Sequence, residues 1–338
     1  MGSSMTTSSA ARTRPAPPVW DPRGWGRHVR FLGWASLVAN IAIVVTGGAV
    51  RLTGSGLGCP TWPRCTEQRF TPHGEFQLHA AIEFGNRLLT FVLAAIAIAT
   101  VVAAWQTGRR ELRRLAIVLF LSIPAQAVVG GITVLTGLNP WLVSVHLLIS
   151  MAMVALAVLF LRRIDQPVAT SSYALSGPLS ALAWAVLAAT WAVLYIGTVV
   201  TGAGPHAGDI DTPRNGLDPA ALSQLHADAV FLLVGLTVGL WLAGLAVHGR
   251  HGTRSEVARA GRFLLVVVLA QGLVGFVQYF TDLPEILVGI HMLGAGVVAA
   301  ATTWAVLAVL LPRTSATDTG DTGATDDSAA PAEAARSV

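Results

Sequence analysis

The stretch LHAAIEFGNRLLTFVLAAIAIATVVAAW, residues 78–105, indicates the fold class of the chain. From Leu88 to Trp105 it contains no charged residue, and most of its side chains are apolar. About 20 apolar residues in a helix cross the roughly 30 Å of hydrocarbon in a bilayer. The stretch therefore predicts a transmembrane helix whose polar residues gather in its first turns.

Seven further blocks have a similar length and composition. Of the 338 residues, 53% are hydrophobic and 12% are charged, about half the charge of a typical soluble domain. We expect an all-α integral membrane protein with eight transmembrane helices. The expected spans are residues 31–50, 79–105, 114–136, 141–161, 179–201, 222–247, 260–280 and 285–311.

The arginines predict how these spans are oriented. They concentrate in the N-terminal tail and in the connections after the second, fourth and sixth spans, and such residues stay on the cytoplasmic side. We expect a multi-pass protein of the cell membrane with both termini in the cytoplasm. The net charge of +4 then reflects topology in a lipid bilayer, and we expect no nucleic-acid partner. Residues 1–28 and 313–338 are expected to be disordered cytoplasmic tails.

The spans form an internal repeat. AQAVVGGITVLTGLNPWLVSVH, residues 125–146, aligns with AQGLVGFVQYFTDLPEILVGIH, residues 270–291, and VVTG occurs at both 44–47 and 199–202. Because each unit has an even number of spans, both copies enter the membrane from the same side. The repeat predicts two pseudo-symmetric four-helix bundles, residues 29–165 and 176–312.

Four of the nine histidines take matched positions in the repeat. His79, His146, His226 and His291 each lie in the first turns of a span that begins at the outer surface. Ionisable side chains in a membrane are costly and usually functional, although an interhelical hydrogen bond worth ~0.6 kcal/mol is an alternative role. Because the pair of histidines occurs in both copies of the repeat, we expect these residues to bind a ligand. Heme fits two facing imidazoles between helices better than zinc, which needs three or four converging ligands.

The second span carries further polar residues on the face of His79. At 100° per residue, Glu83, Asn86 and Arg87 fall with it in an arc of about 100°. Glu83 and Arg87 are spaced i, i+4, so they could form a structural ion pair, or Glu83 could accept protons in catalysis. Uncharged residues stand at both counterparts in the second copy, which indicates that this function belongs to the first bundle.

Several segments resemble the heme A synthase family in its actinobacterial form. They are GGAVRLTGSGLGCPTWPRC at 47–65, IEFGNRLLT at 82–90, QAVVGGITVLTGLNPWLVSVH at 126–146 and VGIHMLGAG at 288–296. Members of the family are eight-helix membrane oxidoreductases that convert heme O to heme A by oxidising a ring methyl to a formyl, and they carry a resident heme b. The resemblance implies supply of heme A to an aa3-type terminal oxidase, with heme O synthase and oxidase assembly as partners; it names no electron donor.

The resemblance also implies roles for single residues. It assigns heme b to the second bundle, where His226 and His291 match the iron ligands. It assigns the substrate heme to the first bundle, where we expect His79 and His146 to bind the iron. It makes Glu83 the expected catalytic residue.

One position departs from the family pattern Glu-x-x-His-Arg, because this chain has Asn86 where the histidine is expected. The shared LHA sequence aligns His79 with His226. The distance to the next cytoplasmic arginine instead aligns Asn86 with His226, since it is 23 residues from Asn86, 24 from His226 and 30 from His79. We expect His79 to be the ligand; if it is not, His146 alone holds the iron and one coordination position is open.

Other polar residues are candidates for contact with heme. Arg51 and Arg87 are candidate partners of the heme propionates, and Asn86 is expected in the same pocket. His206 occupies the repeat position of Arg51, so it could have a polar role near a ligand.

Cys59 and Cys65 are the only cysteines, and both lie in the first outer loop. An oxidising exterior favours a disulfide over two free thiols, and the family carries such a pair in this loop. The motif C-x-x-C-H that attaches heme covalently is absent.

Two other functions compete with the synthase. An electron-transfer cytochrome with two b hemes would explain the four histidines but leaves Glu83 unexplained. A transporter with a parallel repeat would predict helix interruptions in mid-membrane, and the sequence offers little beyond Pro124.

Overall fold

The computed structural model describes residues 24–71, 78–165, 177–246 and 254–311. These residues contain eight long helices and no strand, and each of the eight is long and apolar enough to cross a membrane. The predicted all-α membrane fold is therefore confirmed. The helices are α1 (Val29–Leu52), α2 (Leu78–Gln106), α3 (Arg110–Leu135), α4 (Pro140–Asp165), α5 (Gly177–Ala203), α6 (Pro219–Ala246), α7 (Arg254–Phe280) and α8 (Glu285–Leu310).

The helix boundaries follow local sequence signals. α4 and α6 begin at Pro140 and Pro219, and proline suits the first helical position because the amide hydrogen it lacks has no partner there. α3 continues without a break through Pro124. A transporter-like interruption is thus not found at the one place where the sequence suggested it.

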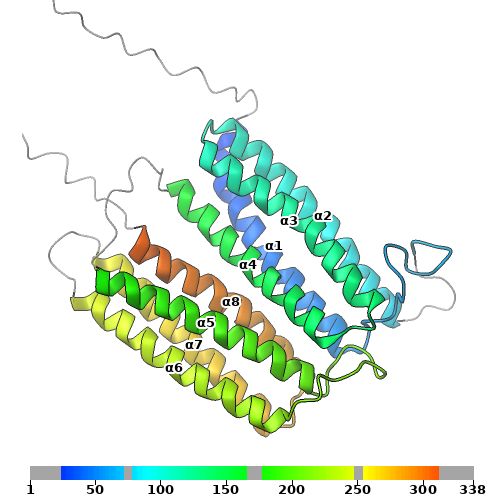
Figure 1. The fold of residues 1–338 in the computed structure, drawn as a ribbon. Coiled ribbons are helices and arrows are strands. Elements are labelled where there is room, and N and C mark those ends of the chain that lie inside the picture. The colour runs from blue at the N-terminus through cyan, green and yellow to red at the C-terminus, as the bar shows by residue number, and fades with distance from the viewer. Residues whose placement is uncertain (1–23, 72–77, 166–176, 247–253, 312–338) are drawn as a thin grey trace, which may run out of the picture.

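The helices form two groups that lie side by side, α1–α4 and α5–α8 (Figure 1). In each group, helices adjacent in the chain pack together, and the first helix packs against the fourth. The groups meet through α1 and α4 on one side and α5 and α8 on the other. We call them the first and second bundle; their pseudo-symmetry, and their limits at 29–165 and 176–312, stay predictions.

Small side chains form much of the bundle interiors. Ala103, Ala104, Ala116 and Ala157 are fully buried in the first bundle, which lets helix backbones approach closely where lipid provides no hydrophobic driving force. Large apolar side chains such as Phe91 point outward, as expected for surfaces that contact lipid.

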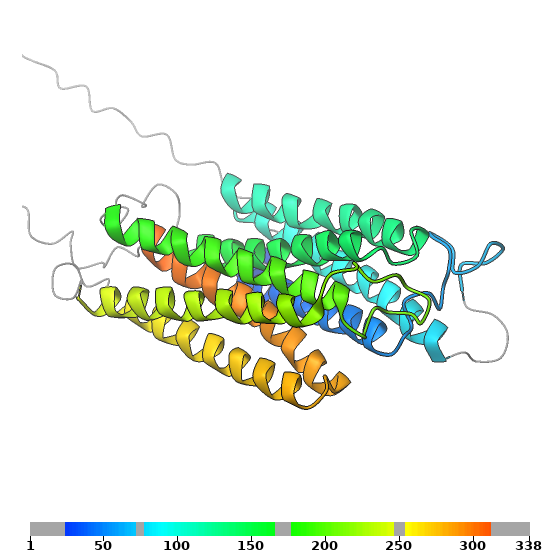
Figure 2. The ribbon, with the colours of Figure 1, turned by 60° about the horizontal axis from the view of Figure 1, so that its bottom comes forward.

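Two ends of the molecule can be distinguished. The loops at residues 53–71 and 204–218 lie at one end (Figure 2), together with the short turns after α3 and α7; we call this the loop end. The opposite end carries Arg109 and Arg162, and we call it the arginine end. Of the predicted tails, residues 25–28 form a short 3-10 helix, whereas 1–23 and 312–338 lie outside the described residues.

Candidate functional site

His146 and His291 occupy equivalent places in the two bundles. A Cβ atom added to Gly130 of α3 would lie 3.2 Å from His146 Cε1, and one added to Gly275 of α7 would lie 3.2 Å from His291 Cε1. Each imidazole therefore lies directly against a neighbouring helix backbone. A larger residue at either glycine would press on the ring.

A glutamine secures the helix turn that carries each of these histidines. Gln126 Nε2 donates to the backbone oxygen of His146 at 3.0 Å, and Gln271 Nε2 donates to that of His291 at 2.7 Å. The Gln-to-His spacing, which is equal in the two copies of the repeat, thus corresponds to an equivalent hydrogen bond in each bundle. The equal spacing is the one signal in the sequence for this contact.

His226 completes the set in the second bundle. A Cβ atom on Gly197 of α5 would lie 3.0 Å from His226 Cε1, so this ring also packs against the preceding helix. His226 and His291 are close enough to interact electrostatically. Helices α6 and α8 therefore direct their imidazoles into one common region.

Each of these three imidazoles has one buried nitrogen without a hydrogen-bond partner among the described residues. Nδ1 of His146, His226 and His291 is buried and has no hydrogen-bond partner among the described residues. Buried polar atoms in proteins are nearly always paired, so these rings have capacity for a bound group. The described residues contain no group of three or more His, Cys, Asp or Glu that could hold a metal ion.

His79 lies in a different environment from the other three histidines. It is exposed at the start of α2, where its Nδ1 lies 3.0 Å from Ser55 Oγ. It lines an open hollow of about 420 Å³ at the loop end. The other residues around this hollow are Gly54, Leu57, Gly58, Asp209 and Ile210.

Asn86 lies deeper on the same helix. Thr46 Oγ1 of α1 donates to Asn86 Oδ1 at 2.8 Å. Arg109, the next arginine after α2, follows Asn86 by 23 residues and His79 by 30, and Arg250 follows His226 by 24. By this spacing, the counterpart of His226 in the first bundle is Asn86.

Glu83 and Arg87 form an ion pair that also holds the first outer loop. Arg87 Nε donates to Glu83 Oε1 at 3.1 Å, and the backbone N–H of Cys59 donates to Glu83 Oε2 at 2.6 Å. Glu83 is 5% exposed. The carboxylate is therefore buried between its own helix and the loop.

Arg87 uses all of its N–H groups in this arrangement. Besides two hydrogen bonds to Glu83, it donates to the backbone oxygens of Cys59, Thr61 and Arg64. A guanidinium has five N–H donors, and these contacts account for them. In this structure Arg87 thus binds the loop, and no donor remains for a second anion such as a propionate.

The loop between Cys59 and Cys65 is closed by a disulfide, which confirms the predicted pair. Both cysteines are buried. Trp62 of this loop packs on α3, because a Cβ atom on Gly131 would lie 2.3 Å from its ring. The loop therefore covers the loop end of the first bundle, next to the helix turn that faces His146.

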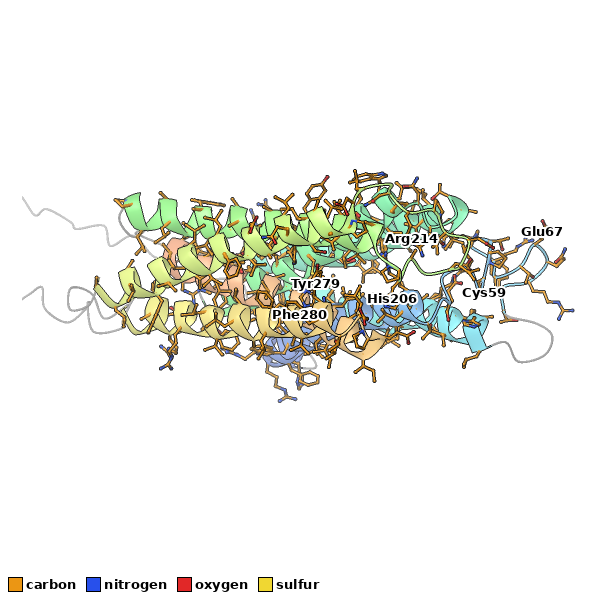
Figure 3. The ribbon with its side chains drawn as sticks, turned by 90° about the horizontal axis from the view of Figure 1, so that it is seen from below. Cys59, Glu67, His206, Arg214, Tyr279 and Phe280 are labelled. Atoms are coloured by element: carbon orange, nitrogen blue, oxygen red, sulfur yellow. A yellow bond between two sulfur atoms is a disulfide. The ribbon has the colours of Figure 1, made fainter. Side chains whose placement is uncertain are left out.

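Arg51 and His206 connect the two bundles at the loop end. Arg51 Nη2 donates to the backbone oxygen of Thr201 at 2.7 Å, and its Nε donates to that of His206. The ring of His206 donates through Nε2 to the oxygen of Leu283 at 3.0 Å. Figure 3 shows His206 at the same end as Cys59 and Arg214. These contacts give Arg51 and His206 roles in holding loops together.

The chain is similar to known proteins along most of its membrane region. The model of the COX15-CtaA family, described as cytochrome oxidase assembly protein, matches residues 30–212. Heme A synthase of Geobacillus kaustophilus is 27% identical over 267 residues, 76% of this chain and 84% of that protein. Heme A synthase of Bacillus cereus is 27% identical over 277 residues, 78% of this chain and 88% of that protein.

Proposed function

Since the chain belongs to the COX15-CtaA family of cytochrome oxidase assembly proteins, we propose that it is a heme A synthase, an oxidoreductase that converts heme O to heme A. The relatives with this name, aligned over most of both chains, support the proposal. The observation that carries it is the set of three half-buried imidazoles in two bundles, each packed against a glycine of a neighbouring helix.

The second bundle is the proposed site of a resident heme b. His226 and His291 fit this group, because α6 and α8 bring their rings to one region and glycines on α5 and α7 make room for them. When bound, heme b supplies one-electron redox chemistry. The protein's part is to provide both imidazoles and a dry, apolar surrounding.

The first bundle is the proposed site of the substrate heme. His146 supplies an imidazole in the same setting as His291. Glu83 supplies a carboxylate that can accept protons released as the methyl group is oxidised, and Arg87 holds this carboxylate in place. The disulfide loop covers the bundle at this end and limits the entry of water. His79 is the other candidate ligand. It supports this site less than His146 does, because it is exposed at the start of α2 and contacts Ser55 of the loop.

The cellular setting follows from the same proposal. The protein would lie in the cell membrane with its arginine end and both termini in the cytoplasm. The disulfide loop would then face the oxidising exterior, where disulfides persist. A heme O synthase would supply the substrate, and an oxidase of the aa3 type would receive the product.

Extraction and analysis of bound hemes test the function. The protein, purified after expression with a heme O synthase, should contain heme b together with heme A or residual heme O; without the synthase it should contain heme b alone. His146→Ala should lose heme A and O and retain heme b. Heme b alone in both preparations of the unaltered protein would support the two-heme cytochrome instead.

The heme b assignment has a separate spectroscopic test. Two imidazole ligands make the heme six-coordinate and low-spin, so His226→Ala or His291→Ala should remove this spectrum or convert it to a high-spin one. Ser223→Ala, which removes a half-buried hydroxyl one turn before His226 on the same helix, is the matched control. An unchanged low-spin heme b spectrum in both histidine variants would reject the assignment.

A further inference from the structure

We propose that the iron of the substrate heme has a single protein ligand, His146, and that the side-chain amide of Asn86 faces the open coordination position as a hydrogen-bond donor. This inference rests on the proposed function, because it concerns the heme of the first bundle. It makes the two heme sites chemically different although the helices around them repeat.

The first argument is the position of Asn86. His226 packs against the preceding helix α5 at Gly197, and Asn86 binds the preceding helix α1 at Thr46. The next arginine after each span follows Asn86 by 23 residues and His226 by 24. Asn86 is therefore the residue of α2 that corresponds to His226 by this spacing.

The second argument is the order of helices around each bundle. In the first bundle α2 and α4 each contact α1 and α3, and in the second α6 and α8 each contact α5 and α7. Asn86 and His146 thus come from opposite helices of the ring, as His226 and His291 do. His146 would therefore hold a heme from the side of α4, and Asn86 would contact it from the side of α2.

The third argument is the chemistry and orientation of the amide. A neutral amide is a poor ligand for heme iron, whose protein ligands are imidazole, thiolate, thioether or phenolate. Oδ1 of Asn86 accepts the hydroxyl hydrogen of Thr46, so the N–H groups of Nδ2 stay available as donors. An N–H donor without iron affinity is suited to stabilise a small ligand bound to the iron.

The fourth argument is the distance of His79 from this level. It lies seven residues before Asn86, or about 10.5 Å along the helix at 1.5 Å per residue. Its ring is exposed and contacts Ser55 of the loop. To bind the same iron as His146, it would have to leave this contact and descend about two helical turns.

Carbon monoxide binding to the dithionite-reduced protein tests the inference. In protein loaded with heme O, about one CO should bind per two hemes, because the bis-imidazole heme of the second bundle has no open position. Asn86→His should abolish CO binding and convert the high-spin heme to a low-spin one. Asn86→Val should keep CO binding and raise the C–O stretching frequency, because a hydrogen bond to the CO oxygen is lost.

Two further variants separate the alternatives. His79→Ala should leave CO binding and the C–O frequency unchanged, and Thr46→Val should keep CO binding but change the C–O band because the amide loses its anchor. Unaltered protein that binds no CO, with CO binding gained in His79→Ala, would show that His79 is the ligand. An unchanged C–O frequency in Asn86→Val would reject the donor role.

Heme analysis of the same samples distinguishes failure of this inference from failure of the proposed function. Protein that forms heme A yet binds no CO overturns the inference alone. Protein that binds CO at the first-bundle heme but forms no heme A overturns the function and leaves the coordination inference standing. Uptake of only one heme per chain overturns the inference as well.

Discussion

At the scale of single residues, Glu83 and Arg87 hold the disulfide loop, and Glu83 also has a proposed role in catalysis. Arg87 donates to three backbone oxygens of the disulfide loop, and Glu83 accepts the Cys59 N–H. The pair therefore organises the loop whether or not the carboxylate takes part in chemistry. A substitution must preserve this structural role to reveal a catalytic one.

Glu83→Gln preserves the shape of the side chain and removes its charge. If the carboxylate accepts protons during the oxidation, heme A formation should fall by about 100-fold or more, while both hemes remain bound. Heme O or a hydroxylated intermediate should accumulate in extracted hemes. Asp228→Asn is the matched control, since it removes an exposed carboxylate from α6 in the second bundle.

A purely structural role of Glu83 has a different outcome. In that case Glu83→Gln should loosen the loop and lower heme content, but each folded molecule should still produce heme A. Normal heme A yield per folded molecule in this variant would reject the catalytic role and leave the ion pair as the explanation.

At the scale of elements, the disulfide loop is bound to two helices. Arg87 of α2 holds its backbone, and Trp62 packs on Gly131 of α3. Both cysteines are buried, so a reductant reaches the disulfide only when the loop moves. The rate of reduction therefore reports how firmly the loop is attached.

Gly131→Ala should weaken this attachment. Its Cβ would lie 2.3 Å from the Trp62 ring, and overpacking of this kind costs about 1–3 kcal/mol. We expect reduction of the disulfide by dithiothreitol to accelerate about tenfold, measured by thiol labelling and mass spectrometry. Gly272→Ala in α7 is the control, because no atom lies within 4 Å of its added Cβ. Equal rates for both variants would show that Trp62 does not hold the loop closed.

At the scale of the whole molecule, the two bundles are joined at both ends. Arg51 connects them at the loop end. At the arginine end, Arg162 of α4 forms an ion pair with Glu256 of α7 and donates to the backbone oxygen of Leu311 at 2.5 Å. Arg162 is 4% exposed, so these partners, rather than water, compensate its buried charge.

Arg162→Ala should destabilise the assembly of the two bundles. Removal of one partner from a buried ion pair costs about 3–5 kcal/mol, which should appear as a lower unfolding temperature in detergent. The control is Arg30→Ala, which breaks an ion pair with Asp165 in which the arginine is 62% exposed; exposed pairs contribute about 0–1 kcal/mol. Similar losses in both variants would mean that the Arg162 contact does not couple the bundles.

The eight spans could be predicted from the sequence, because each depends only on local length and hydrophobicity. The Cys59–Cys65 pair could be predicted as well, and the repeat aligns His146 with His291, which makes both of them candidates. The tertiary structure alone decided which partners the other polar residues have. Helical periodicity placed Glu83 and Arg87 on one face but could not reveal that the loop occupies that face.

The alignment of α2 with α6 shows the same limit most clearly. The shared LHA sequence aligns His79 with His226, whereas the spacing to the next arginine aligns Asn86 with it, because the loops before α2 and α6 differ in length. The contacts of the two candidates differ, since Asn86 binds Thr46 of α1 and His79 lies against Ser55 of the loop. These contacts join residues far apart in the chain, and local sequence patterns carry no information about such pairings.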